Sequence, residues 1–497
     1  MQIHPSFGDF KALARNAGVV PVWYEFLFDT HTAVTAYEKL ARPPFGFLLE
    51  SVVGGEQWAR YSFLGSQPRE AWRLQGGGVS TWTPETGWRE TGVKDPLRDL
   101  DRRLREWRPA RVPALPRFWG GAVGYFGYDV VRHIEDLPHP PEDDLEVPDG
   151  LFLFTDVVLI IDNLLGRGMA VASVPTEEGL TEGELEARYR EGARRAEGLV
   201  RRLGEGSSLS PLDLAPGPEE TPTPAGSMTR EAFQEGVERI RSYIQAGDAF
   251  QVVLSQRLDM PFRGRPFDLY RVLRTVNPSP YLYFLELDGV TLVGASPEVL
   301  VRLEEGTVTV RPIAGTRPRG QTPREDRTLA SDLLADEKEL AEHRMLVDLG
   351  RNDVGRVARY GSIRVPDLMV VERYSHVMHL VSQVEGELQE GLTAMDVFRA
   401  CFPAGTVSGA PKIRAMEIID ELEPVKRGPY AGAVGYFSYG GMAMDTAITI
   451  RTVVVTGGRA FVQAGAGIVA DSDPAREFQE TLNKARALLQ AGSMVPP

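Results

Sequence analysis

The segment of residues 204–226, "GEGSSLSPLDLAPGPEETPTPAG", constrains the architecture of this 497-residue chain more than any other. It is rich in Pro, Gly, Ser and Thr and has little apolar periodicity, which is typical of a linker. We therefore predict an N-terminal region over residues 1–203, a linker over 204–228 and a C-terminal domain over 229–497.

Strand-like and helix-like segments occur on both sides of this linker. Before it, "GFLLESVV" (46–53) and "LFLFTDVVLIID" (151–162) predict strands, and the charged "TEGELEARYREGARRAEGLVRRL" (181–203) predicts a helix. After it, "TREAFQEGVERIRSYIQAGD" (229–248) predicts a helix that leads into a strand, "AFQVVLSQRL". These elements do not alternate strictly as βαβ units, so the expected fold class is α+β.

Two segments echo each other: "GGAVGYFGYD" at 120–129 and "AGAVGYFSYG" at 431–440. In each, glycines flank a Val and aromatic run, as expected where a strand passes close to another backbone. Nothing else around the two segments aligns, so we interpret them as similar strands in two sheets rather than as a repeat.

Composition excludes several classes of protein. A net charge of −14 argues against general nucleic-acid binding, which requires a basic face. No apolar run is long enough to span a membrane, and the N-terminus lacks the features of a signal peptide, so a cytoplasmic protein is expected. Cys401 is the only cysteine, which excludes an intrachain disulfide and thiol-type zinc sites. Any metal must be held by oxygen or histidine.

Two pairs of glutamates are spaced to share a helix face. The stretch "LADEKELAEHRM" (334–345) predicts an amphipathic helix with Glu339 and Glu342 one turn apart. Near the C-terminus, Asp473 and Pro474 predict a helix start, after which Glu477 and Glu480 have the same spacing. Two such helices are either solvated surfaces or the two sides of an oxygen-ligated Mg²⁺ site.

Three polar turns suggest a site for an anion with several oxygens. They lie in "VRPIAGTRPRG" with Gly315 and Thr316, in "FPAGTVSGAPK" with Thr406, and in "QAGAGIVADS" with Gly465 and Gly467. His379, in a strand-like apolar run, and Glu298, between a turn and a strand, are ordinary structural residues when each is considered alone.

Taken together, nine motifs between residues 229 and 490 resemble those of the chorismate-utilising enzymes. They occur in the order "DAFQVVLSQR", "GASPEVL", "RPIAGTRPRG", "DEKELAEHRMLVDLGRNDVGRV", "VMHLVS", "CFPAGTVSGAPK", "GPYAGAVGYFSY", "TIRT" and "QAGAGIVADSDPAREFQETLNKAR". The resemblance implies an α/β sandwich of two facing antiparallel sheets flanked by helices. It also implies a Mg²⁺ ion held between two glutamates and a substrate carboxylate.

The resemblance implies roles for individual residues. Glu342 and Glu480 correspond to direct Mg²⁺ ligands, with Glu339 and Glu477 beside them as acids that act through water or neighbouring groups. Glu298 corresponds to a general acid and His379 to a histidine associated with the elimination step. The implied substrate contacts are Gly315, Thr316, Thr406, Tyr430, Arg451, Gly465, Ala466, Gly467 and Lys484.

Two positions distinguish the members of this superfamily. In the isochorismate and salicylate synthases of the superfamily that this sequence resembles, a lysine that activates water occupies the position of Gln251. In the aminodeoxychorismate synthases, a lysine typically occupies the position of Ala314. This sequence has neither lysine. It is therefore most similar to component I of anthranilate synthase, the large subunit, with an aminodeoxychorismate synthase large subunit as the alternative. A non-catalytic regulator that binds tryptophan or chorismate is the alternative from another class.

The N-terminal half resembles the regulatory part of the same family. "FLLES" and "NPSPYLYFLEL" are similar to the segments that bind L-tryptophan there, which implies feedback inhibition through Glu50, Ser51, Pro280, Tyr281 and Leu282. The alternative is that "FLLES" is simply a buried strand that ends at the surface.

The resemblance also implies a reaction and a partner. Anthranilate synthases convert chorismate and ammonia to anthranilate and pyruvate, the first step of tryptophan biosynthesis. The ammonia comes from a glutamine amidotransferase, whose nucleophilic cysteine this chain lacks, because Cys401 lies in the chorismate-binding "CFPAGT" motif. A separate amidotransferase subunit, in a heterotetramer by family precedent, is therefore expected.

Overall fold

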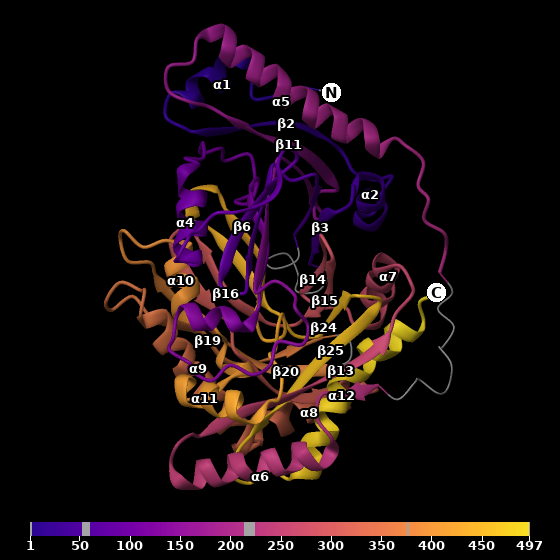
Figure 1. The fold of residues 1–497 in the computed structure, drawn as a ribbon, viewed down its shortest axis with the longest axis vertical. Helices are drawn as coiled ribbons and strands as arrows, with labels where there is room; N and C mark the ends of the chain where they lie inside the picture. Colours follow the sequence, from indigo (N-terminus) through magenta and orange to yellow (C-terminus); the bar gives the residue numbers. More distant parts are fainter. Residues whose placement is uncertain (1, 52–59, 213–223, 375–376, 497) are drawn as a thin grey trace.

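Two antiparallel β-sheets face each other and carry helices on their outer sides in the computed structural model, which describes residues 2–51, 60–212, 224–374 and 377–496. The expectation of an α+β sandwich is confirmed (Figure 1). Residues 213–223 of the predicted linker lie outside the described residues.

The first sheet combines strands from both halves of the chain. Its β3 from the N-terminal half pairs directly with β14 from the C-terminal half, with Leu282 opposite Glu50. Its order is β1 (Ile3–His4), β2 (Val19–Leu27), β11 (Arg167–Pro175), β10 (Val157–Asp162), β4 (Tyr61–Ser66), β3 (Phe45–Glu50), β14 (Tyr281–Leu287), β15 (Val290–Ser296), β24 (Thr452–Thr456), β25 (Arg459–Ile468), β13 (Gln251–Pro261) and β12 (Ala225–Gly226), with β21 (Gly409–Ala410) also paired to β13.

The second sheet is also shared between the halves. Its order is β18 (Ile313–Pro318), β20 (Val377–Glu387), β17 (Thr307–Val310), β16 (Val299–Glu304), β23 (Met444–Ile448), β22 (Ala433–Ser438), β8 (Gly121–Phe126), β9 (Gly150–Phe154), β5 (Glu70–Gln75), β6 (Gly78–Thr83) and β7 (Gly87–Glu90), with β19 (Arg364–Arg373) paired to β20. The two halves are therefore joined by continuous hydrogen-bonded sheets, although they are separated in sequence.

The two echoed glycine-rich segments are neighbours in this second sheet. Our expectation that they belong to two different sheets was wrong, because β8 and β22 pair with each other and Gly124 lies opposite Gly435. A Cβ atom at Gly124 would lie 1.9 Å from the Leu151 carbonyl oxygen of β9, and one at Gly435 would lie 2.1 Å from the Asp445 carbonyl oxygen of β23. Neither position therefore has room for a side chain.

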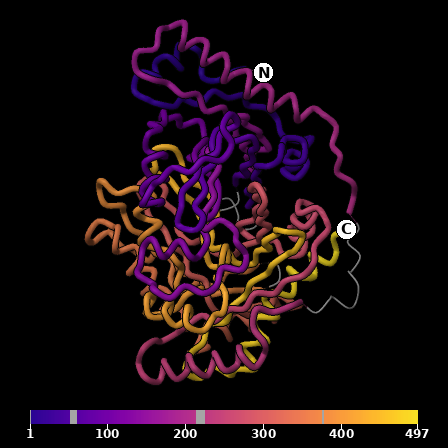
Figure 2. Tube along the Cα trace, in the orientation of Figure 1, coloured from indigo at the N-terminus to yellow at the C-terminus, as the bar shows by residue number. Residues whose placement is uncertain are grey.

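Helices cover the outer sides of the sandwich. Helix α5 lies along β2 and β11 at the upper end of the view, and α6 and α12 lie at the lower end (Figures 1 and 2). The helices are α1 (Phe7–Ala14), α2 (Ala33–Leu40), α4 (Pro96–Glu106), α5 (Glu182–Leu203), α6 (Arg230–Ala246), α7 (Pro266–Val276), α8 (Pro323–Ala335), α9 (Glu337–Gly355), α10 (Ala394–Cys401), α11 (Lys412–Leu422) and α12 (Pro474–Ser493), with 3₁₀ turns η1 (Tyr128–His133), η2 (Gly405–Val407) and η3 (Tyr439–Gly441).

The predicted helix boundary is confirmed for the pair Glu477 and Glu480 but is wrong for the pair Glu339 and Glu342. Asp473 caps α12 by accepting from Arg476 N–H, with Pro474 at the first helical position, as predicted. The predicted helix over 334–345 is instead divided between α8 and α9. Asp336 interrupts it, because its carboxylate caps the N-terminus of α9 by accepting from the N–H groups of Lys338 and Glu339.

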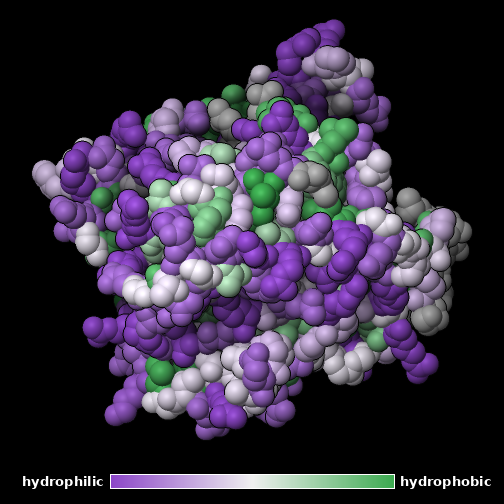
Figure 3. Space-filling view, turned by 90° about the horizontal axis from the view of Figure 1, so that it is seen from above, coloured by the Kyte–Doolittle hydropathy of each residue, from purple (hydrophilic) through white to green (hydrophobic). Residues whose placement is uncertain are grey.

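An aromatic cluster fills the space between the second sheet and the helices α4 and α10. Trp72, Phe126 and Phe152 of this sheet pack there with Phe398 of α10, with ring centroids 4.6–6.3 Å apart. The surface seen from above is largely hydrophilic (Figure 3). Among the described residues, no helix combines the length and the apolar character that crossing a membrane requires.

Candidate active site

Glu298 is a buried carboxylic acid between β15 and β16, with 7% of its surface exposed. Burial raises the pKa of Glu298 to about 8, against smaller opposing contributions from the Thr406 hydroxyl and the Ile313 backbone N–H. Its backbone carbonyl accepts from Ile448 N–H at 3.0 Å, which fixes the local chain. Glu298 is therefore protonated at neutral pH and can donate a proton to a leaving group.

His379, on β20, is held as a neutral imidazole. Its Nδ1 lies 3.0 Å from the carbonyl oxygen of Gly315 and 3.1 Å from the Thr316 hydroxyl. Because a carbonyl can only accept, Nδ1 carries the proton and Nε2 keeps its lone pair. Burial lowers the pKa of His379, so the ring is neutral at neutral pH and Nε2 can accept a proton.

Arg451 and Tyr430 form a second polar group, next to α12. Arg451 has left-handed backbone torsion (φ 52°), which is rare for a residue with a side chain, and its Nη1 donates to the carbonyl of Lys484 at 2.6 Å. Burial raises the pKa of Tyr430 to about 12, so its hydroxyl stays protonated. The pair offers donors suited to a carboxylate.

The segment Gly465–Ala466–Gly467 lies inside β25 and does not form the turn that the sequence suggested. It pairs with β13 between Val253 and Ser255. The glycines serve another purpose, because a Cβ at Gly465 would lie 2.8 Å from the Tyr430 hydroxyl and one at Gly467 would lie 2.3 Å from Gln251 Nε2. Small residues here let side chains from neighbouring elements approach the strand.

One glutamate of each acidic pair is linked to this strand segment through another side chain. Glu342 on α9 accepts from Gln251 Nε2 at 3.1 Å. Glu480 on α12 forms an ion pair with Lys484 at 2.7 Å, and the Nζ of Lys484 also donates to the Gly465 carbonyl at 3.0 Å. Burial, together with the charge of Glu342, raises the pKa of Glu339. Burial and the charge of Glu480 likewise raise the pKa of Glu477.

The four glutamates do not converge on one point. The described part of the chain holds no group of three or more His, Cys, Asp or Glu side chains close enough to share a metal ion. Glu342 and Glu480 are nevertheless linked to the same strand segment, through Gln251 and Lys484, and offer only oxygen donors, which suit Mg²⁺. Two protein ligands leave room for water and a substrate carboxylate, so the donor set fits the predicted ion.

A buried ion pair behind the site was not predicted from the sequence. Arg427, 2% exposed, donates through Nε and Nη2 to Glu423, 4% exposed. Arg427 also donates to the carbonyls of Val253 on β13 and of Val407 beside Thr406, and its guanidinium lies 5.6 Å from the ring centroid of Tyr430. In the sequence, only the position of Arg427, three residues before Tyr430, indicated that it lies near the substrate site.

A cavity of about 1170 Å³ lies between the two sheets and is lined by residues from both halves of the chain. All five residues predicted for the tryptophan site line it: Glu50, Ser51, Pro280, Tyr281 and Leu282. Glu50 is engaged by Arg274 at 3.2 Å and by the Tyr270 hydroxyl, whereas the buried Ser51 Oγ has no hydrogen-bond partner among the described residues.

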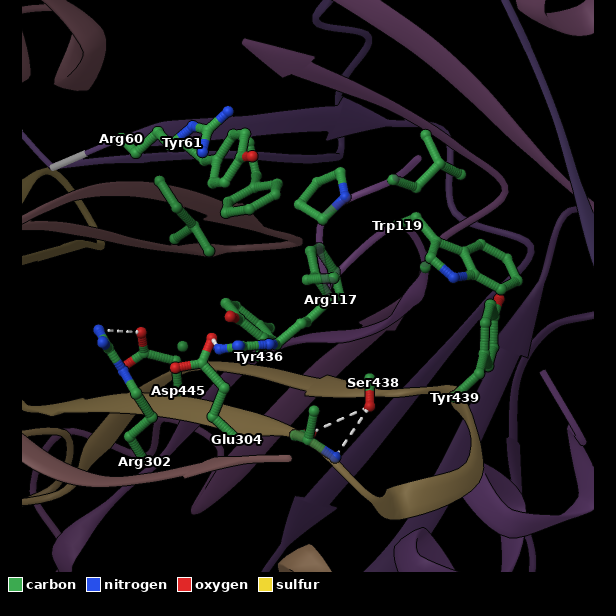
Figure 4. A pocket seen from close by; sticks show the side chains of 18 of the residues that line it. Arg60, Tyr61, Arg117, Trp119, Arg302, Glu304, Tyr436, Ser438, Tyr439 and Asp445 are labelled. Carbon is green, nitrogen blue, oxygen red and sulfur yellow. Dashed lines mark hydrogen bonds and ion pairs between the residues drawn. The ribbon is translucent and has the colours of Figure 1, made fainter. Parts of the chain in front are cut away.

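The opposite wall of the cavity comes from the second sheet and was not predicted. Tyr281 donates to Asp445 at 2.9 Å, and Arg302 reaches the other oxygen of Asp445 at 2.6 Å. Arg60 and Tyr61 lie across the cavity from this pair (Figure 4). These residues are distant in sequence and share no motif, so only the fold brings them together.

The fold and these sites define a class of protein, and comparison with known families agrees. A family model described as chorismate binding enzyme matches residues 58–490. The menaquinone-specific isochorismate synthase of Escherichia coli shares the fold, with a TM-score of 0.68 at 18% identity over 97% of this chain and 98% of that one. The chain belongs to the family of chorismate binding enzymes.

Within that family, the chain belongs to the anthranilate synthase component 1 group. It is 52% identical over 477 residues to the anthranilate synthase component 1 of Pseudomonas putida, covering 95% of each chain. It is 47% identical over 494 residues to that of Aquifex aeolicus, covering 99% of this chain and 98% of that one. Anthranilate synthase component I of Streptococcus pneumoniae superposes with a TM-score of 0.76 at 39% identity, over 93% of this chain and 99% of that chain.

Proposed function

We propose that this chain converts chorismate and ammonia to anthranilate and pyruvate, with Mg²⁺ as cofactor and L-tryptophan as feedback inhibitor. The observation that supports the proposal is the buried acid Glu298, which is protonated at neutral pH and accepts from Ile313 of β18, the strand whose Gly315 carbonyl holds the neutral His379. An acid and a base with separated pKa values suit a reaction that expels a hydroxyl group and then removes a proton.

The substrate is held by charge and hydrogen bonds. Arg451 and the Tyr430 hydroxyl receive the carboxylate of the enolpyruvyl arm, and the Thr406 hydroxyl and the Gly315–Thr316 segment contact the rest of the molecule. Lys484, tied to Gly465 and Glu480, keeps α12 against β25 at this site.

The first step forms a C–N bond at C2 of chorismate and breaks the C–O bond at C4. Glu298 donates its proton to the departing hydroxyl, which leaves as water, and the nitrogen releases one proton to solvent. In the second step the C2 proton is removed and the enolpyruvyl group leaves as pyruvate, giving the aromatic ring. The free Nε2 of His379 is the acceptor or orienting group for that elimination.

Glu342 and Glu480 would hold Mg²⁺, with Glu339 and Glu477 acting through water or neighbouring groups. The ion, when bound, neutralises the ring carboxylate and polarises the substrate for departure of the hydroxyl.

The ammonia is supplied by a separate glutamine amidotransferase subunit, in a cytoplasmic heterotetramer. Cys401 cannot serve as an amidotransferase nucleophile, because it is buried and burial strongly raises the pKa of its thiol.

Anthranilate fluorescence from the purified chain tests the proposal directly. With chorismate, Mg²⁺ and ammonium at mildly alkaline pH, the fluorescence of anthranilate is expected to rise with time, and L-tryptophan is expected to suppress the rise. Formation of aminodeoxychorismate would instead support the alternative synthase. Binding of chorismate without any product would support a regulator.

Removal of divalent metal is expected to lower the ammonia-dependent rate by about two orders of magnitude or more, because the substrate carboxylate then faces unneutralised glutamates. The measurement is the initial rate after treatment with EDTA, followed by addition of excess MgCl₂, which is expected to restore it. An EDTA-resistant rate would contradict the assignment of Glu342 and Glu480.

Ser51→Ala is expected to weaken inhibition by L-tryptophan about tenfold, because the buried Ser51 Oγ has no partner within the described part of the chain and can bind the inhibitor. The measurement is the half-inhibitory tryptophan concentration, with the uninhibited rate expected to stay within about twofold. Ser80→Ala is the matched control, since Ser80 is a buried serine outside the cavity whose Oγ already accepts from Arg73. Unchanged inhibition in Ser51→Ala would remove Ser51 from the inhibitor site.

A further inference from the structure

Tyr374, the residue that follows β19, lies with its ring beside the imidazole of His379. The two ring centroids are 5.6 Å apart and the ring planes meet at 62°, an edge-to-face arrangement. Glu372 is opposite His379 in the pairing of β19 with β20, so Tyr374 approaches the imidazole from the β19 side. This ring is therefore a direct neighbour of the group that we assign to the elimination step.

The direction of the free nitrogen of His379 depends on the plane of its ring. Nδ1 is held by the Gly315 carbonyl and lies near the Thr316 hydroxyl, which leaves Nε2 for the substrate. The outer side-chain torsion of histidine has broad minima, so hydrogen bonds at one nitrogen do not fix the ring plane. The contact with the Tyr374 ring limits this rotation and thereby the direction of Nε2.

Tyr374 is itself anchored at its hydroxyl and at its backbone. The hydroxyl donates to Glu372 Oε2 at 3.0 Å, and Arg311 binds both oxygens of Glu372, with Nη1 3.1 Å from Oε2. The Tyr374 N–H donates to the Val377 carbonyl at 2.8 Å, and the Tyr374 carbonyl accepts from Arg319 Nη1 at 2.6 Å. Burial and the charge of Glu372 raise the pKa of Tyr374, so its hydroxyl remains a donor. The ring is thus held by groups other than His379.

A chemically similar trio lies elsewhere in the molecule. Tyr243 on α6 donates its hydroxyl to Glu421 of α11 at 2.7 Å, and Arg239 binds the other oxygen of Glu421. The ring of Tyr243 lies 5.1 Å from the guanidinium of Arg414. A tyrosine held by a glutamate and an arginine is therefore an ordinary structural arrangement, and what distinguishes Tyr374 is the imidazole beside it.

We propose that Tyr374 is a positioning residue for the elimination step, because its ring holds the imidazole of His379 with Nε2 directed at the substrate. This inference rests on the proposed function. In the elimination, the C2–H bond and the C–O bond to the enolpyruvyl arm break and the ring gains a double bond. The proton ends on the departing enolpyruvate, which becomes pyruvate. Nε2 serves this step as acceptor or orienting group, so its direction affects the rate.

The first step has no such requirement. Formation of the C–N bond at C2 and departure of the C4 hydroxyl depend on Glu298 and on the incoming nitrogen. Without the Tyr374 ring, amination is therefore expected to continue while elimination slows. The aminated intermediate, which still carries its enolpyruvyl arm, then accumulates in place of anthranilate.

The test measures the yield of anthranilate per chorismate consumed in Tyr374→Leu, which removes the ring and keeps an apolar side chain. With ammonium and Mg²⁺ supplied, chorismate consumption is expected to stay within about threefold, whereas the yield falls about tenfold and the aminated intermediate is detected by chromatography. Because the yield is a ratio, a partly unfolded preparation does not change it. Tyr243→Leu is the matched control, with an unchanged yield.

Tyr374→Phe keeps the ring but loses the bond to Glu372, and its yield is expected to fall about threefold. An unchanged yield in Tyr374→Leu overturns the inference. So does an equal loss of chorismate consumption and of anthranilate without any intermediate, which would show a general effect on the site. If Tyr374→Leu does not fold, an unchanged yield in Tyr374→Phe overturns the inference. Absence of anthranilate from the unmodified chain would instead defeat the proposed function.

Discussion

Glu298→Gln is expected to lower kcat for anthranilate formation by about 10²–10⁴-fold, because glutamine fills the same buried space but has no proton to give the departing hydroxyl. The KM for chorismate is expected to change little. In the unmodified chain the acid form is required, so the rate at constant free ammonia is expected to fall as pH rises through the Glu298 pKa of about 8. The measurements are steady-state kinetics and a pH–rate profile followed by anthranilate fluorescence.

Glu286→Gln is the matched control for that prediction. Glu286 lies on β14 of the first sheet, and burial raises its pKa as well, but the charged groups that act on it are Arg265 and Glu38. Its glutamine variant is expected to keep kcat within about twofold. Full activity in Glu298→Gln, or an equal loss in both variants, would remove Glu298 from the role of general acid.

Arg427→Met is expected to lower the free energy of unfolding by about 3–5 kcal/mol, because it leaves the buried Glu423 carboxylate without its cation. It also frees the carbonyls of Val253 and Val407, which the guanidinium joins, and thereby loosens the turn that carries Thr406. The measurement is chemical denaturation followed by intrinsic fluorescence, with chorismate KM as a second readout.

Two variants separate the loss of a buried charge partner from a general loss of packing. Arg427→Met combined with Glu423→Met removes both charges and is expected to recover most of the stability while the KM for chorismate stays raised. Arg190→Met breaks an exposed pair with Glu186 within one helix and is expected to cost at most about 1 kcal/mol. A double variant as unstable as Arg427→Met alone would show that packing, rather than the unpaired charge, dominates.

Local motifs made parts of the C-terminal half predictable, because residues that are close in the sequence also lie close together in the fold. Asp473 and Pro474 begin α12 as predicted, and Glu477 and Glu480 follow from that start. The separation of α8 from α9 was missed, since the capping carboxylate of Asp336 sits within an otherwise continuous helical pattern. The glycines of β25 were assigned to a turn, because a sequence does not show which side chains from other strands approach them.

The sequence by itself determined the α+β class, the family and the candidate acid, base and carboxylate-binding residues, because motif chemistry and local periodicity are short-range properties. Only the tertiary structure decided that β8 pairs with β22, that Arg427 and Glu423 are buried together, and that Asp445 meets Tyr281 across the cavity. These contacts join residues that are distant in the chain or depend on burial. Both are set by the packing of the two sheets, which no local pattern encodes.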